Sequence, residues 1–254
     1  MNKIPALTAG ASPLASPLQA TRPSTGIARP QMRRYQIDSL LPNGDIDTQR
    51  MTAPALPLFE DAFCAFARGT LIDTAEGPRA IEDLMPGDAL RLEDGTASQV
   101  LWIGSSAFSA DGPRPKALTR IMPDSFGMAR PMSNMIAGPS ARLLHTPEHL
   151  RRGPEHARML MPVRSFVDGV NIVETTPPTP VQTFHICLAH HAVIRIGGLL
   201  FETYHPGTTA VRSISHTLRQ LFLALFPHIE TLGDFGGLAY PRHEDRPRDG
   251  SFAA

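Results

Sequence analysis

Residues 69–104 read GTLIDTAEGPRAIEDLMPGDALRLEDGTASQVLWIG. Turn-forming residues recur in this stretch at 76–78, 86–88 and 93–96, where it reads Glu-Gly-Pro, Pro-Gly-Asp and Glu-Asp-Gly-Thr. Glycine supplies positive φ, proline fixes φ and aspartate bonds its own backbone, so such clusters end extended segments. Turns about 8–12 residues apart are typical of an all-β barrel or sandwich. The stretch therefore predicts short strands, of which the apolar run 100–103 is the last.

The same alternation of extended runs and turns continues to about residue 206. The 25 prolines and 20 glycines are 18% of the 254 residues, against about 12% on average, and this excess favours turns and strands over long helices. A chain of this length buries about 70–75% of its unfolded surface, enough for a sizeable core. The sequence predicts an all-β fold, with further strands at 118–122, 159–162, 170–174, 182–188, 193–196 and 199–203.

The N-terminal part differs in composition from the rest. Residues 1–32 are mostly Pro, Ser, Thr, Ala and Gly, and such a stretch buries too little surface to offset the entropy of ordering it. We expect a disordered leader there. Residues 33–63 are expected to form a hairpin and then an apolar arm, because Asn43-Gly44 between two extended runs is the strongest short-range hairpin signal.

The C-terminal part is expected to form a helix and a loose tail. Leu218, Leu221 and Leu225 fall on one helical face, and Pro227 stops the run. Packing of this face on the β domain is the simpler expectation, and docking of a partner protein is the alternative. The chain is thus divided into a leader (1–32), a hairpin and arm (33–63), a β domain (64–210) and a C-terminal helix and tail (211–254).

Composition and charge exclude several classes of protein. The 24 basic and 24 acidic residues give a net charge of zero, which argues against a nucleic-acid binder. Two cysteines cannot build a disulfide scaffold. No apolar run approaches the ~18 residues of a membrane span. Pro5, Pro13 and Pro17 interrupt any secretory signal, so the compartment is unknown: cytoplasmic, or reached by export without a classical signal.

Three stretches carry a resemblance to a known family. They are AFARGTLI at 65–72, LLHTPEH at 143–149, and FHICLAHHAV at 184–193 with ETYHPG at 202–207. In this order they resemble the opening, internal and closing blocks of the hedgehog/intein (Hint) self-processing domains, most of all the bacterial stand-alone type. The resemblance implies an all-β, horseshoe-shaped domain over about residues 64–207.

The resemblance also implies a chemistry. A cysteine that opens the domain attacks the carbonyl of the residue before it, so that the peptide bond becomes a thioester. Thiolate is suited to this step because it is a good nucleophile and a good leaving group. A histidine protonates the leaving amide nitrogen, and hydrogen-bond donors stabilise the oxyanion. Any enzymatic activity is then at most intramolecular autoproteolysis by a cysteine N–S acyl shift, without a cofactor.

The sequence departs from the family pattern at the nucleophile. The family cysteine lies four residues before the glycine of Gly69-Thr70, and that position is Ala65 here. Cys64 stands one residue earlier. Because successive side chains of a strand point to opposite faces, a shift of one residue turns the thiol away from the site unless a bulge intervenes. Ala189 likewise stands where family members often carry aspartate.

Three functional hypotheses follow. In the first, the domain is degenerate and serves as a binding or structural module whose leader or C-terminal helix contacts a protein partner. In the second, the domain is active: Cys64 attacks the carbonyl of Phe63, His149 of the Thr146-x-x-His149 block is the general acid, and His191 tunes the nucleophile.

In the third hypothesis the domain binds zinc. His185, Cys187 and His191 lie at odd spacings in one extended segment, so a regular strand puts them on one face. Together with His149 they would form a four-ligand site. The chain has no CxxC or HExxH pattern, and a small buried thiol is the plain alternative for Cys187.

Overall fold

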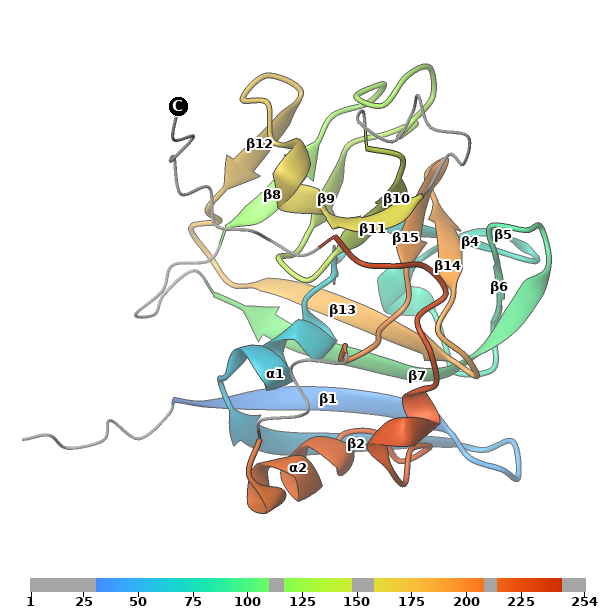
Figure 1. Cartoon of the computed structure of the whole chain (residues 1–254), viewed down its shortest axis with the longest axis vertical. Coiled ribbons are helices and arrows are strands. Elements are labelled where there is room, and N and C mark those ends of the chain that lie inside the picture. Colours follow the sequence, from blue (N-terminus) through green and yellow to red (C-terminus); the bar gives the residue numbers. More distant parts are fainter. Residues whose placement is uncertain (1–30, 110–116, 148–157, 208–213, 244–254) are drawn as a thin grey trace, which may run out of the picture.

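The computed structural model describes residues 31–109, 117–147, 158–207 and 214–243 (Figure 1). Antiparallel strands dominate these residues and join in one open sheet, which confirms the predicted all-β class. The strands are β1 (Met32–Leu40), β2 (Ile46–Pro54), β3 (Phe66–Ala67), β4 (Leu71–Thr74), β5 (Gly77–Ala80), β6 (Ala89–Arg91), β7 (Ala97–Phe108), β8 (Leu118–Ile121), β9 (Met135–Ala137), β10 (Arg142–His145), β11 (Met159–Pro162), β12 (Ile172–Thr175), β13 (Val181–Leu188), β14 (Val193–Ile196) and β15 (Leu199–Glu202).

The helices of the described residues are short, and the two α-helices flank the strands β3 to β15 in sequence. They are α1 (Pro57–Glu60) and α2 (His216–Leu223), with 3-10 turns at Asp61–Phe63, Ile81–Asp83, Val163–Phe166 and Leu232–Phe235. Ser215 caps α2, since its hydroxyl accepts the backbone N–H of Leu218. The C-terminal helix is therefore confirmed. The predicted apolar arm is itself partly helical, because Pro57 provides a preset φ at the start of α1.

The turns that the sequence predicts are present. Each contains a glycine in the left-handed region, with φ of 121° at Gly77, 104° at Gly87 and 86° at Gly95. The predicted hairpin at Asn43-Gly44 is β1 paired with β2, in register from Met32 opposite Pro54 to Leu40 opposite Ile46. The strands β3, β9 and β10 are not among those that the sequence predicts.

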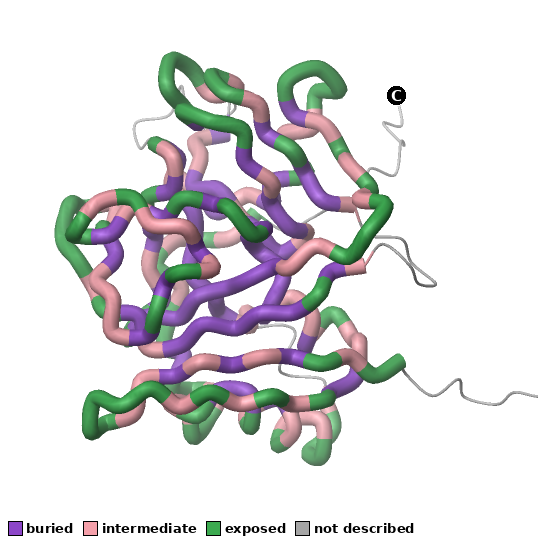
Figure 2. The backbone as a smooth tube through the Cα atoms, turned by 180° about the vertical axis from the view of Figure 1, so that it is seen from behind, coloured by how far each residue is buried: buried purple, intermediate pink, exposed green. Residues whose placement is uncertain are grey.

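Strand β7 is the centre of the sheet. It pairs with β6 through its first residues, with β13 along most of its length and with β1 over residues 102–106. The path of the sheet runs from β11 at one end to β12 at the other without closing. β13 is buried from Thr183 to Leu188, and β7 is mostly buried from Val100 to Phe108 (Figure 2).

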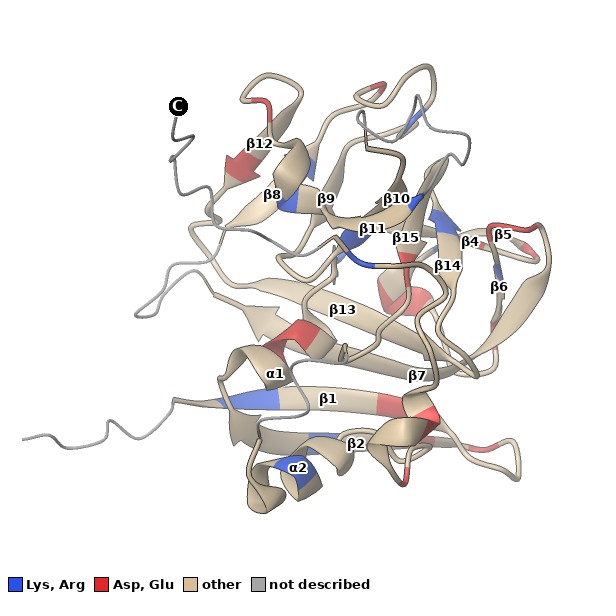
Figure 3. Cartoon of the chain, in the orientation of Figure 1, with Lys and Arg blue, Asp and Glu red and all other residues tan. Residues whose placement is uncertain are grey.

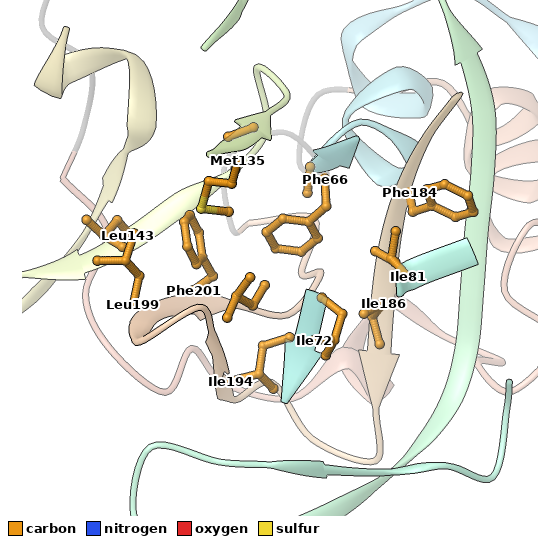
Figure 4. Packing of buried hydrophobic residues seen from close by; sticks show 14 of the residues in the cluster. Phe66, Ile72, Ile81, Met135, Leu143, Phe184, Ile186, Ile194, Leu199 and Phe201 are labelled. Atoms are coloured by element: carbon orange, nitrogen blue, oxygen red, sulfur yellow. The ribbon is translucent and has the colours of Figure 1, made fainter. Parts of the chain in front are cut away.

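The main core packs against one face of β13 and β7, where Phe184 and Ile186 of β13 join the cluster that Figure 4 shows. Phe66 and Phe201 meet there edge to face at 5.4 Å between ring centroids. The inward residues alternate along the strands, as in Ile194 and Ile196 of β14, because side chains of a strand alternate between its faces. This alternation with a period of two residues is the sequence pattern that predicts strands.

A second core lies on the other side of β7. Trp102 is at its centre and is completely buried, with its indole N–H donating to the carbonyl of Leu225 at 2.7 Å. The hairpin supplies Tyr35 and Ile37, the segment before the domain supplies Phe63, and α2 with the residues after it supplies Phe222 and Phe226. Residues before and after the β domain thus share one core with it.

Two further expectations from the sequence are a disordered leader and the absence of a membrane span. The leader predicted to be disordered lies, up to residue 30, outside the described residues. Across the described ranges, no helix combines the length and the apolar character that a membrane span requires.

Gly104 lies against two aromatic rings of the second core, those of Trp102 and Phe63. A Cβ at this position would overlap the indole ring of Trp102 and come within 2.6 Å of the ring of Phe63. We expect Gly104→Ala to lower the free energy of unfolding by about 1–3 kcal/mol through overpacking. The matched control is Gly237→Ala, because nothing lies within 4 Å of a Cβ there. Urea unfolding of the two variants checks this, and equal midpoints would contradict the packing described.

Candidate functional site

A polar cavity of about 170 Å³ lies between segments that are distant in sequence. Its lining comes from the segment of α1, from the start of β10, from β13, from the end of β15 with the residues after it, and from the C-terminal segment. The polar members are Asp61, Ser140, Arg142, His185, Glu202, Tyr204, His205 and Arg242. The closing block of the sequence therefore faces the cavity, together with residues from both flanks of the β domain.

Glu202, the last residue of β15, is the centre of the site. Figure 3 shows how the acidic and basic residues are distributed over the described strands and helices. Its side chain is 1% exposed, and it accepts from three donors: Arg142 Nη1 at 3.1 Å, Arg242 Nε at 3.0 Å and His191 Nε2 at 3.2 Å. A buried carboxylate is costly unless its charge is paired and its oxygens are hydrogen-bonded. Both conditions are met, because Oε1 contacts Arg142 and Oε2 contacts both other groups.

These partners decide the ionisation of Glu202. Burial by itself raises the pKa of the carboxyl group, but the hydrogen bond from His191 and the charges of Arg242 and Arg142 outweigh burial. The pKa of Glu202 is held at about 2. The group is therefore a permanent anion at neutral pH, and it cannot serve as a proton donor there.

Hydrogen bonds fix the tautomers of two histidines at the site. The Nδ1 atom of His191 accepts the backbone N–H of Ala239 at 2.9 Å, so Nε2 carries the proton that goes to Glu202. The Nδ1 atom of His205 accepts the N–H of Gly207 at 2.9 Å, and its Nε2 donates to the carbonyl of Gly236 at 3.1 Å. Both ring nitrogens of both histidines are thus occupied.

His185 is the third histidine of the site. It is 2% exposed and meets the rings of Phe66 and Tyr204 edge to face, at 5.8 and 5.2 Å. Burial lowers its pKa to about 3, so the ring is neutral at pH 7. Its Nδ1 faces the N–H of Ile186 at 3.1 Å, which leaves the proton on Nε2. His185 is therefore a neutral hydrogen-bond donor at the cavity wall.

Cys64 and Ala65 belong to different regions of the interior. The thiol of Cys64 packs with Phe108 and Leu118 and lines a separate hollow of only about 20 Å³, together with Tyr35 of β1. Ala65 is fully buried in the main core. The adjacent side chains point into different clusters, and Cys64 is not among the described residues that line the polar cavity.

The other predicted site residues are distributed as follows. Thr146 lies just after β10 and is half-buried. His149, the predicted general acid, lies outside the described residues. His191 is next to the cavity, but both of its ring nitrogens are hydrogen-bonded, one to Glu202 and one to the backbone of Ala239. The structure thus brings His191 and His185 to one site and puts Cys64 elsewhere.

The residues of the zinc hypothesis are not grouped. His185 and Cys187 share a face of β13 as expected, but Cys187 packs in the second core with Trp102, and burial raises the pKa of its thiol well above the usual value. Within the ranges that the structure describes, no three His, Cys, Asp or Glu side chains are arranged to hold a metal ion. His149, the fourth proposed ligand, is outside those ranges.

Sequence reasoning missed the arginines of the site. Arg142 lies just before the internal block, and Arg242 lies 40 residues after Glu202, in a segment without a motif. The two arginines reach the carboxylate of Glu202 only through the tertiary structure, so no local sequence pattern indicates the contact. His205 and Glu202 stand in the quoted ETYHPG block, so a search for buried charge in that block would have found them.

The pH dependence of stability follows from these groups. Below pH 6.5 unfolded histidines gain protons while His185 and His205, with pKa values of about 3 and 4, stay neutral, so the free energy of unfolding falls. Below pH 4.5 the unfolded carboxyl of Glu202 gains a proton while the folded one, at about 2, stays charged, so the free energy falls further. The stabilisation by Glu202 is complete above pH 4.5 and is lost towards pH 2.

We expect Glu202→Gln to lower the free energy of unfolding at pH 7 by about 3 kcal/mol, because two partly buried guanidinium groups lose their counter-charge. Between pH 4.5 and 2 the variant should lose stability less steeply than the parent, and between pH 6.5 and 4.5 about equally. Glu174→Gln on exposed β12 is the control. Urea unfolding from pH 7 to 3 checks this, and parallel curves over the whole range would refute it.

Comparisons with known proteins identify the family of this chain. Among solved structures, the chain is similar to the crystal structure of the MchDnaB-1 intein, with 18% identity and a TM-score of 0.33, over 55% of this chain and 100% of that chain. No curated protein matches. A family model described as the Hint domain matches residues 64–208, more than half of the chain. The chain therefore belongs to the Hint domain family.

Proposed function

We propose that this Hint domain has lost self-cleavage and acts as a binding or structural module. The observation that carries the proposal is the separation of Cys64 from the polar cavity. The alignment that the sequence resemblance suggests puts the methyl group of Ala65 at the family's nucleophile position, and a methyl group has no atom able to attack a carbonyl. Methyl fills a core position without leaving an unsatisfied polar group, so the fold survives the loss.

The surroundings of Cys64 support this proposal over the active alternative. The thiol is 6% exposed and packs against Phe108 and Leu118. The backbone is equally confined, because a Cβ on Gly138 would overlap the carbonyl oxygen of Cys64. In the active alternative, the thiol of Cys64 would have to attack the carbonyl of Phe63 within close-packed surroundings, since Cys64 is nearly and Phe63 fully buried.

The position of His191 is also difficult to reconcile with catalysis. In the active alternative it tunes the thiol of Cys64. Its two nitrogens are instead used by the N–H of Ala239 and the carboxylate of Glu202. A histidine bonded at both nitrogens orients its neighbours and has no free lone pair for a thiol proton. We therefore assign His191 a structural role within the Glu202 network.

The partner contact of such a module is the remaining question. Of the two candidates, α2 has its apolar face in the second core, where Phe222 is fully buried. That face is not available to another protein without unfolding the core. The leader, residues 1–32, is thus the better supported contact for a protein partner.

Mass spectrometry of the purified, denatured protein tests the loss of self-cleavage. We expect only the full-length mass, with or without added thiol, because Ala65 has no nucleophilic atom and the thiol of Cys64 is packed against Phe108 and Leu118. The variant Cys64→Ala should give the same single mass, and so should Cys187→Ala, whose thiol is buried in the second core.

Fragments 1–63 and 64–254 would contradict the proposal if thiol increased them and Cys64→Ala abolished them. Under the active alternative, Cys187→Ala keeps the fragments, since the thiol of Cys187 is remote from the chemistry. The pair of variants thus separates a specific N–S acyl shift from adventitious proteolysis.

A further inference from the structure

Strand β1 lies in the interior of the sheet although it precedes the Hint domain in sequence. One edge pairs with β2 along all nine residues of the strand, and the other edge pairs with β7 from Tyr35 opposite Ser106 to Ser39 opposite Trp102. Both rows of backbone groups of β1 therefore have neighbours over its central part. The family match begins only at residue 64, so this strand is an addition to the matched domain.

The inward side chains of β1 are held by the second core. Tyr35 is 1% exposed and its ring centroid is 4.3 Å from that of Phe63, while Ile37 is fully buried. Alternate residues such as Gln36 are only partly buried. The strand thus presents one apolar face to the domain, as a half-buried strand does.

Polar contacts fix the register of β1 on β7. Arg33 donates to the carbonyl of Ala107 at 2.6 Å and pairs with Glu60 of α1 at 3.1 Å. The hydroxyl of Ser106 donates to the carbonyl of Arg34 at 3.1 Å. Because a shift of one residue would turn Tyr35 and Ile37 away from the core, only one register satisfies both sets of contacts.

Without β1, residues 102–106 of β7 would be a free edge. An unpaired edge presents a row of N–H and C=O groups that binds another extended chain. In this protein the chain's own N-terminal flank takes that position, and the turn at 42–45 that connects β1 to the rest is exposed.

We propose that the domain retains its N-terminal polypeptide by strand complementation: β1 stays bound to β7 through non-covalent contacts even when the chain is broken after it. Breaking the chain and releasing the upstream segment are then separate events in this protein. The inference does not depend on the proposed loss of self-cleavage, because retention is decided by β1 and cleavage by residues 63–65.

A protease site inserted between Asn43 and Gly44 of the full-length chain tests retention. The turn there is exposed, so a sequence-specific protease reaches it under native conditions. We expect residues 1–43 to elute with residues 44–254 in native size-exclusion chromatography, and the two pieces to separate in denaturant. Elution of residues 1–43 as a free peptide in native buffer would overturn the proposal.

Two substitutions in β1 test whether the apolar face is what retains it. In the nicked protein, Tyr35→Ala should raise the rate at which residues 1–43 dissociate by about a hundredfold, since a buried aromatic ring is lost. Gln36→Ala on the other face should leave the rate within about threefold of the parent. Equal rates for the two variants would show that the face does not hold the strand. The result with the parent sequence stands even if Tyr35→Ala fails to fold.

Discussion

The carboxylate of Glu202 is the constraint on which the arrangement of this protein depends. A charge this deeply buried must be compensated, and the compensating groups come from β10, from the loop before β14 and from the C-terminal segment. Those segments are consequently held in one position relative to β15. The tautomers of His191 and His205 follow from the same arrangement, because the backbone of residues 236–239 supplies a partner to each ring.

The C-terminal segment lines part of this site, although it lies outside the residues that the family model matches. Matching ends at residue 208, yet Arg242 reaches Glu202 and also donates to the carbonyl of His205 at 2.9 Å. On the opposite side, Asp61 and the residues of α1 form another wall. Segments on both flanks of the matched residues thus contribute to the lining of the polar cavity, and Arg242 from one of them binds Glu202.

Sequence patterns predicted the class of fold and the positions of many turns, because a turn is determined by a few residues adjacent in sequence. Gly77, Gly87 and Gly95 adopt positive φ where their neighbours predicted turns, and Asn43-Gly44 forms its hairpin. The site was harder to predict. The parity argument for Cys64 and Ala65 needs only adjacent residues, and the two side chains do lie in different clusters. The pairing of Arg242 with Glu202 depends on the packing of α2 and the residues after it, which no local pattern encodes.

The position of β7 between the two hydrophobic cores affects how the protein unfolds. This strand has a neighbour on each edge and a hydrophobic cluster on each face, and Gly104 lets Trp102 and Phe63 close over it. Neither cluster can loosen without uncovering the same strand. The two halves of the interior are therefore expected to melt together, as one cooperative unit, and the amide protons of β7 should exchange with solvent only when the whole chain unfolds.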